Sequence, residues 1–221
     1  MKHSTIVVTI VGVVLASGVA ADTQVPWVGE VVFAPTQEGS IHMTPDGDGA
    51  PLSEARQLDN SVVDATIRVR LVNSWLDPIA NFPFEDLWLQ FDLDEGTAAG
   101  CVSYGGSYEG GVFLADSSTS ADGWTEFALP LRGGGWSEGP VWIYLNGGPA
   151  MAPDFITWPP LPLRANSPDL NGDLLVNLSD IAPFTMDLFG EYHYRSDLMW
   201  DGVINLADVV LFTRSIGVVC E

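Results

Sequence analysis

Residues 169–180 read Asp169-Leu-Asn171-Gly-Asp173-Leu-Leu175-Val-Asn177-Leu-Ser-Asp180, and residues 197–208 repeat the pattern as Asp197-Leu-Met199-Trp-Asp201-Gly-Val203-Ile-Asn205-Leu-Ala-Asp208. Both segments place Asp at positions 1, 5 and 12 and Asn at position 9. Calcium takes six to eight oxygen ligands. A tight loop of this length supplies them from positions 1, 3, 5, 9 and 12 and from the carbonyl at position 7. The repeat therefore predicts two Ca2+ sites.

The expected ligands follow from these positions. In the first site they are Asp169, Asn171, Asp173, Asn177, Asp180 and the carbonyl of Leu175. In the second site they are Asp197, Asp201, Asn205, Asp208 and the carbonyl of Val203. Leu174 stands at position 6 of the first loop, where the turn prefers Gly. Met199 offers a soft sulfur at position 3 of the second loop, which a hard cation disfavours. We expect a strained first site and a weaker second site.

This duplicated Asp-rich loop, followed each time by a short helix, resembles a type I dockerin, a small α-helical module with EF-hand-like loops. The resemblance covers 166–221 and implies two bound calcium ions and a protein partner of the cohesin class. Complexes of dockerins with cohesins often belong to assemblies that degrade polysaccharides. Positions 10 and 11 depart from the family, since they hold Leu178-Ser179 and Leu206-Ala207 in place of a Ser-Thr pair. Docking of the module onto its own neighbouring domain is the alternative. We expect helices over 180–189, capped by Ser179, and over 208–216.

The N-terminus has the pattern of a targeting segment. Lys2 and His3 precede an apolar run over 6–16, and small residues follow at 18–21. A run of this length is too short to span a bilayer comfortably, so residues 1–21 are expected to be a secretory signal peptide. We therefore expect a secreted bacterial protein, extracellular or held at the cell surface, with no membrane span after cleavage.

Charge narrows the range of partners. The chain carries 29 acidic residues against 8 basic ones, for a formal net charge of −21. A surface this acidic repels phosphate backbones and anionic lipids. Nucleic acid is therefore not expected as a partner, whereas calcium suits such a surface.

The region 22–165 has the period-two pattern of β-strands. Its clearest example is 66–71, where Ile67, Val69 and Leu71 alternate with Thr66 and two arginines. Turn signals, among them the run 133–135 of three glycines, separate several such strands. Many short strands with Gly and Pro turns predict a mainly β fold, a β-sandwich. The prolines between 149 and 168 predict an extended tether at its end, in which residues 161–164 are a candidate last strand of the sandwich.

Two segments of this region are similar to bacterial Ig-like domains of the invasin and intimin type. They are 64–79, with its strand-turn-strand pattern, and 119–127, where an Asp-Gly pair precedes a strand. The resemblance implies an Ig-like β-sandwich with a spacer, adhesion or display role. Catalysis is not expected, since the only histidines after the signal peptide, His42 and His193, lie in different domains and no nucleophile motif is present.

Two features leave alternatives open. Trp88 and Trp142 lie opposite the aliphatic faces of their strands, so these rings are candidates for stacking on carbohydrate, although tryptophans more often fill a core. A carbohydrate-binding module is therefore an alternative function, and a small glycoside hydrolase with paired carboxylates is a weaker one. Cys101 and Cys220 are able to pair in an oxidising compartment, but the sequence also permits two separate thiols.

Overall fold

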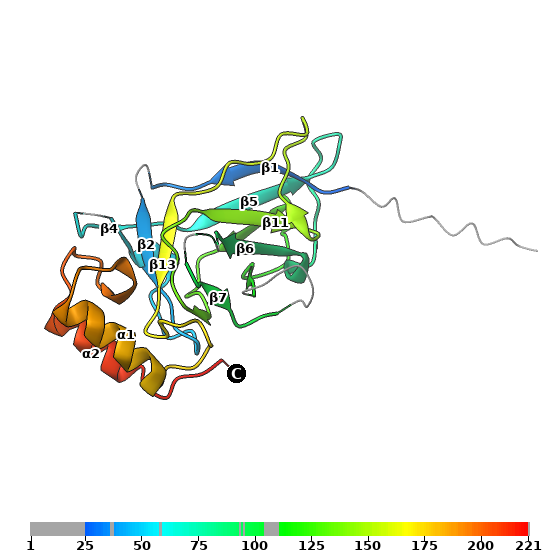
Figure 1. The fold of residues 1–221 in the computed structure, drawn as a ribbon. Helices are drawn as coiled ribbons and strands as arrows, with labels where there is room; N and C mark the ends of the chain where they lie inside the picture. Colours follow the sequence, from blue (N-terminus) through cyan, green and yellow to red (C-terminus); the bar gives the residue numbers. More distant parts are fainter. Residues whose placement is uncertain are drawn as a thin grey trace, which may run out of the picture.

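The computed structural model describes residues 25–35, 38–57, 59–92, 94, 96–103 and 111–220. The expected signal peptide, residues 1–21, lies outside the described residues. The described chain is mainly β, and its two α-helices lie near the C-terminus (Figure 1). We call residues 25–166 the β-domain and residues 167–220 the C-terminal module.

The strands of the β-domain form four small sheets. One sheet has the order β1 (Trp27–Val32), β5 (Ile67–Val72), β9 (Trp124–Phe127). A second has the order β12 (Gly148–Pro149), β11 (Val141–Leu145), β6 (Leu87–Phe91), β8 (Phe113–Leu114). A third has the order β13 (Leu163–Asn166), β2 (Gly39–His42), β3 (Ala55–Gln57), β4 (Val62–Val63). The smallest pairs β10 (Gly133–Gly134) with β7 (Ala99–Gly100). Short 3-10 turns precede β3 and β6, at η1 (Leu52–Glu54) and η2 (Phe84–Asp86).

One hydrophobic core joins the larger sheets. In β5 the alternation predicted from sequence is observed, because Ile67, Val69 and Leu71 are fully buried while Arg68 is exposed. Val28, Leu89 and the other core residues of β1, β2, β6, β9, β11 and β13 pack into the same cluster. Burial of these apolar side chains is the main term that stabilises the β-domain.

The glycine run and the proline-rich segment differ from the sequence-based expectation. Gly133 and Gly134 are strand residues, since they pair antiparallel with Gly100 and Ala99. Leu161 exchanges backbone hydrogen bonds of 2.8 and 3.0 Å with Val141, and β13 pairs in parallel with β2. The candidate last strand at 161–164 is thus observed as β13, and the segment after Pro149 is held to the sheets instead of forming a tether. Its non-proline residues still supply N–H and C=O groups for pairing.

The C-terminal module consists of the two Asp-rich loops of the sequence repeat and the helices that follow them. The helices are α1 (Leu178–Phe189) and α2 (Leu206–Arg214), and the 3-10 turn η4 (Tyr194–Ser196) connects them. Phe184 and Phe212 stack with ring centroids 4.7 Å apart and form a small core with Leu170 and Leu198. Within the described residues, neither helix has the length and apolar character needed to cross a membrane.

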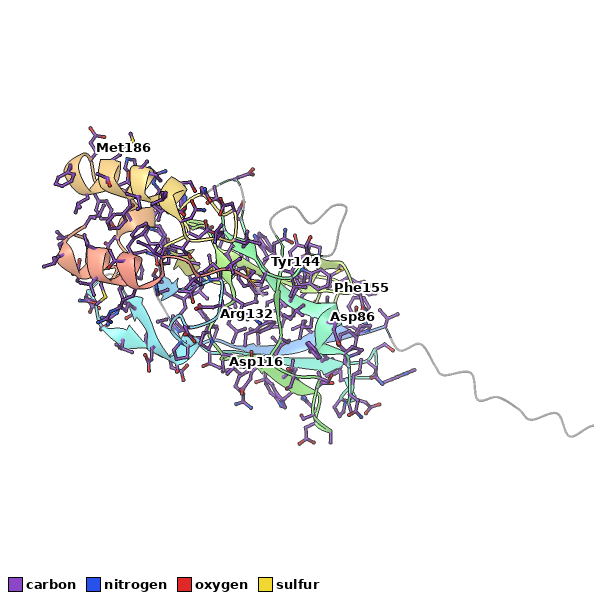
Figure 2. The ribbon with its side chains drawn as sticks, turned by 90° about the horizontal axis from the view of Figure 1, so that it is seen from below. Asp86, Asp116, Arg132, Tyr144, Phe155 and Met186 are labelled. Atoms are coloured by element: carbon purple, nitrogen blue, oxygen red, sulfur yellow. A yellow bond between two sulfur atoms is a disulfide. The ribbon has the colours of Figure 1, made fainter. Side chains whose placement is uncertain are left out.

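The module lies at one end of the β-domain, beside β2 and β13 (Figure 1). The hydroxyl groups of Ser40 and Tyr194 are 2.7 Å apart, and the Arg164 guanidinium lies over the Tyr194 ring. Figure 2 shows Met186 on the side of α1 that faces away from the β-domain, and the Met186 side chain is 72% exposed. The module therefore has an inner face against the β-domain and an outer face open to solvent.

Candidate metal centre

The first loop is organised around two buried carboxylates. Asp169 and Asp180 are both 0% exposed. The Asp169 oxygens accept hydrogen bonds from the backbone N–H groups of Gly172, at 3.0 Å, and Leu174, at 2.7 Å. The Asp180 oxygens accept from the backbone N–H groups of Asn171, at 3.3 Å, and Asn177, at 2.9 Å. Asp169, at position 1, thus binds the backbone at positions 4 and 6, and Asp180, at position 12, binds the backbone at positions 3 and 9.

The second loop repeats most of this network, although Asp197 also accepts a hydrogen bond from the Tyr192 hydroxyl at 2.9 Å. Asp197 and Asp208 are also 0% exposed. Asp197 accepts from the backbone N–H of Gly202 at 2.8 Å, and Asp208 accepts from those of Met199 at 3.0 Å and Asn205 at 2.8 Å. The sequence repeat is therefore also a structural repeat.

Both helices are capped by position 9 of their loop and begin at position 10. Asn177 caps α1, because its side chain accepts from the N–H of Ser179 while Asp180 accepts from the N–H of Asn177, and the two together form a capping box. Asn205 and Asp208 form the same box on α2. The expectation that Ser179 caps the first helix is wrong, since Ser179 lies inside α1, and both helices start two residues earlier than predicted.

Each loop contains two residues in the left-handed region, at positions 4 and 6. In the first loop these are Gly172 (φ +74°) and Leu174 (φ +66°). In the second they are Trp200 (φ +48°) and Gly202 (φ +83°). Each loop thus has glycine at one of the two positions and a side chain at the other. A non-glycine residue here costs roughly 1–2 kcal/mol, so the strain expected at Leu174 has a counterpart at Trp200.

The buried carboxylates have no cationic partner. The salt bridges among the described residues involve Glu38, Glu126, Glu138 and Asp187, but none of the four deep loop acids. Burial raises the pKa of Asp169 to about 6, and the nearby carboxylates of Asp180 and Asp173 add to this shift. Burial likewise raises the pKa of Asp180, Asp197 and Asp208 above the usual range. Buried anions of this kind are stabilised by a cation in proteins, either a basic residue or a metal.

The donor atoms of the loops are those that a hard cation prefers. Asp173 and Asp201 stand exposed at the rims, and Asn171, Asn177 and Asn205 supply amide oxygens. In the part of the chain that the structure describes, no three Asp, Glu, His or Cys side chains are gathered as a metal centre. A bound ion would therefore also need the amides and the carbonyls of Leu175 and Val203. These carbonyls accept hydrogen bonds from Asn177 and Asn205, at 3.1 and 3.2 Å. This all-oxygen set fits calcium in chemistry.

Met199 does not complete the second loop. It is half-buried and lines a cavity of about 440 Å³ between the β-domain and the C-terminal module. The charged and titratable groups around this cavity are His42, Asp46, Asp48, Glu54, Arg56 and Arg214. Position 3 of the second loop thus places an apolar side chain at the cavity between the two parts of the chain.

Cys101 and Cys220 form a disulfide, with Cα atoms 5.6 Å apart. It connects the end of the chain to the residue that follows β7. The sequence left this pairing open, because the approach of residues 119 positions apart depends on the tertiary fold.

The two tryptophans singled out from the sequence lie in different environments. Trp88 is 4% exposed, and its ring stacks on Tyr144 with a centroid distance of 6.0 Å, so its face is covered. Trp142 is half-buried and lines a shallow pocket of about 210 Å³. Trp75, which the sequence pattern did not single out, is 82% exposed at a turn. Strand alternation assigns a side chain to one face of a sheet but does not show whether that face is covered.

Searches against protein-family models, curated proteins and solved structures found no match to this chain. Its function is therefore inferred from the residues of the chain itself.

Proposed function

We propose that this chain is a secreted, non-catalytic attachment protein in which a calcium-stabilised, dockerin-like module carries an Ig-like β-sandwich. The observation that carries the proposal is the set of four buried carboxylates, two in each loop, that have no basic partner among the described residues. Two calcium ions would neutralise them. A module with so small a core gains much of its folding free energy from such metal binding.

The outer faces of the helices support a protein partner. Leu178 and Phe189 on α1 are 78% and 83% exposed, and Leu206 on α2 is 74% exposed. Leu178 and Leu206 occupy the same position of the two repeats. Large apolar side chains that are exposed on the helices of a protein favour an interaction site. A cohesin-like protein is the class of partner that the dockerin resemblance suggests.

Contacts on the inner face support intramolecular docking as well. The Asn166 side chain donates a hydrogen bond to the carbonyl of Asp197, and the Ser40 and Tyr194 hydroxyls are in contact. Docking on the β-domain by one face leaves the opposite face free. The two roles considered for the module are therefore compatible.

Calcium binding by the mature chain tests the proposal. We expect calorimetric titration to reveal two binding events and a melting temperature that falls when a chelator is added. The double variant Leu178→Asp/Leu206→Asp should keep both calcium events and lose capture of a protein partner, because it changes only exposed side chains. The absence of a calcium event together with an unchanged melt in chelator would contradict the proposal.

Carbohydrate binding is the second candidate, and the shallow pocket at Trp142 favours it. Tyr144 and Gln90 lie beside Trp142 in this pocket, with Asp92 and Asp94 at its edge. The Gln90 amide oxygen is buried and accepts no hydrogen bond within the described residues. An aromatic ring with carboxylate acceptors in the same pocket suits the apolar face and hydroxyl groups of a neutral sugar. Loss of binding to insoluble neutral glycans in Trp142→Ala, but not in Trp75→Ala, would support it.

A further inference from the structure

We infer that the first calcium site is a joint site, completed by a glycine run of the β-domain and by the disulfide-linked C-terminal tail, whereas the second site is independent of both. This inference rests on the proposed calcium binding. The elements that complete the site are Gly133–Gly135, Thr97, the tail 217–220 and the Cys101–Cys220 disulfide.

The glycine run forms a surface against which the first ligand lies. A Cβ atom added to Gly134 would overlap the Asp169 carboxylate. The backbone N–H of Gly135 donates a 2.6 Å hydrogen bond to the carbonyl of Asp169. Only a residue without a side chain permits this approach, so the position of Asp169 is set by a strand more than thirty residues earlier in the chain.

Thr97 extends this contact along the loop. Its hydroxyl donates to the carbonyl of Leu170 at 3.4 Å. A Cβ on Gly172 would lie 2.6 Å from the Thr97 carbonyl oxygen, so position 4 of this loop needs glycine for space as well as for its positive φ. The loop from position 1 to position 4 is therefore packed directly on the β-domain.

The tail holds the other half of the loop. The N–H of Val176 donates to Val218 at 2.9 Å, and the N–H of Gly217 donates to Val176 at 2.8 Å. The N–H of Cys220 donates to the carbonyl of Leu174 at 3.2 Å. These bonds keep position 6 and position 8 of the loop in place beside a short stretch of tail.

The disulfide closes this arrangement into a ring. Cys101 follows β7, which pairs with β10 of the glycine run, and its N–H donates to the carbonyl of Arg132 at 3.0 Å. Cys220 therefore connects the tail to the same pair of strands that receives Asp169. The covalent bond holds the two supports of the first loop at a fixed separation.

The second loop lacks these supports. A Cβ added to Gly202 would meet no atom within 4 Å. Among the described residues, Asn166 of the β-domain donates a hydrogen bond to the carbonyl of Asp197, and Met199 and Trp200 line the cavity between the two parts of the chain. Perturbing the glycine run or the tail should therefore change the first site alone.

Calorimetric calcium titration of the full mature chain tests this selectivity. We expect Gly134→Ala to weaken one of the two events at least tenfold and to leave the other unchanged. In an Asp197→Asn background, where only the first site remains, Gly134→Ala should abolish measurable binding. Gly148→Ala is the matched control, because an added Cβ there meets nothing within 4 Å, and it should bind calcium as the wild type does.

A second variant tests the inference without adding volume. Cys101→Ser/Cys220→Ser should weaken the same event several-fold, and reduction of the wild type should do the same. If Gly134→Ala does not fold, the Cys101→Ser/Cys220→Ser variant tests the joint site in its place. The joint site would be overturned if these variants bound calcium at both sites as tightly as the wild type does. It would also be overturned if they weakened both sites by the same factor. A wild type that binds no calcium would instead contradict the proposed function itself.

Discussion

The two loops of the C-terminal module share a pattern of ligands but differ in what surrounds them. Asp169 and Asp197 are equally buried and hold their loops through equivalent backbone hydrogen bonds. The first loop, however, is held between a glycine run and a disulfide-linked tail, and it strains Leu174. The second loop has glycine at position 6, but its position-3 residue, Met199, lines a cavity. A duplicated sequence thus provides two similar ligand sets, and the rest of the fold makes the two sites unequal.

Neutralising one deep carboxylate in each loop should give the largest effect. Asp169→Asn and Asp197→Asn should each remove one calcium event, with an affinity loss of about 100-fold or more, because even residues that only orient a ligand cost 10- to 100-fold. In chelator the same variants should melt above the wild type, since a buried charge without a partner destabilises the folded state. Thermal melts with calcium and with chelator measure both effects.

A variant that melts below the wild type in calcium but above it in chelator distinguishes a metal ligand from an acid with a purely structural role. Asp187, which forms a salt bridge with Arg195, is the control, and Asp187→Asn should destabilise the protein in both conditions. Variants of Asp169 and Asp197 that lower the melting temperature equally in calcium and in chelator would show that these carboxylates serve only the loop backbone.

Exchanging position 3 should reverse the order of the two sites. Met199→Asp adds an oxygen ligand and a charge to the second loop, and its affinity should rise about tenfold, which corresponds to about 1.4 kcal/mol. Asn171→Met removes the equivalent oxygen from the first loop and should lower its affinity by a similar factor. Calorimetry on each variant measures the change. Unchanged affinity in Met199→Asp would mean that the cavity, and not the missing ligand, sets the strength of the second site.

Local patterns predicted the elements better than they predicted the supports of the site. The alternation of Ile67, Val69 and Leu71 correctly gave a buried strand, because alternation depends only on strand geometry. The start of α1 was misplaced, although Asn177 and Asp180 have the spacing of a capping box. The loop pattern assigns Asn177 to a metal ion, whereas in the structure its side chain caps α1.

Features that depend on distant parts of the chain were not predictable in the same way. The three glycines at 133–135 were interpreted as a turn, and only the tertiary fold brings Gly134 against Asp169. Burial of Trp88 likewise requires Tyr144 from a neighbouring strand to cover its ring. In both cases the sequence contains the residue type but not the identity of its neighbour.

Lowering the pH should destabilise the protein through His42, which lines the same cavity as Met199 of the second loop. Burial lowers the pKa of His42 to about 4, and a hydrogen bond with Asn166 opposes this shift only in part. Between about pH 6.5 and pH 4 the unfolded chain therefore binds a proton that the folded chain does not, so stability contributed by neutral His42 is lost as the pH falls. From pH 7 to pH 5.5 we expect the wild type to lose about 1 kcal/mol more than His42→Gln.

Denaturant melts in chelator at these two pH values measure the difference. The loop carboxylates act in the opposite direction, because a raised pKa favours the folded state on acidification, and their contribution is shared by the wild type and the variant. Asp46, Asp48, Glu54, Arg56 and Arg214 line the same cavity and are also common to both. Parallel pH profiles would show that the pKa of His42 is the same in the folded and the unfolded chain, so that burial does not keep His42 neutral.

Relieving the strain at position 6 should give the smallest effect. Leu174 adopts φ +66°, which costs a residue with a side chain roughly 1–2 kcal/mol. Leu174→Gly removes this cost but gives the unfolded chain more freedom, so we expect a net gain of about 0.5 kcal/mol. Gly202→Ala makes the opposite change at the equivalent position, where no neighbouring atom interferes, and should lose about 1 kcal/mol. If Leu174→Gly instead destabilises the protein, contacts of the Leu174 side chain outweigh its backbone strain, and the two loops differ in packing and not in conformation.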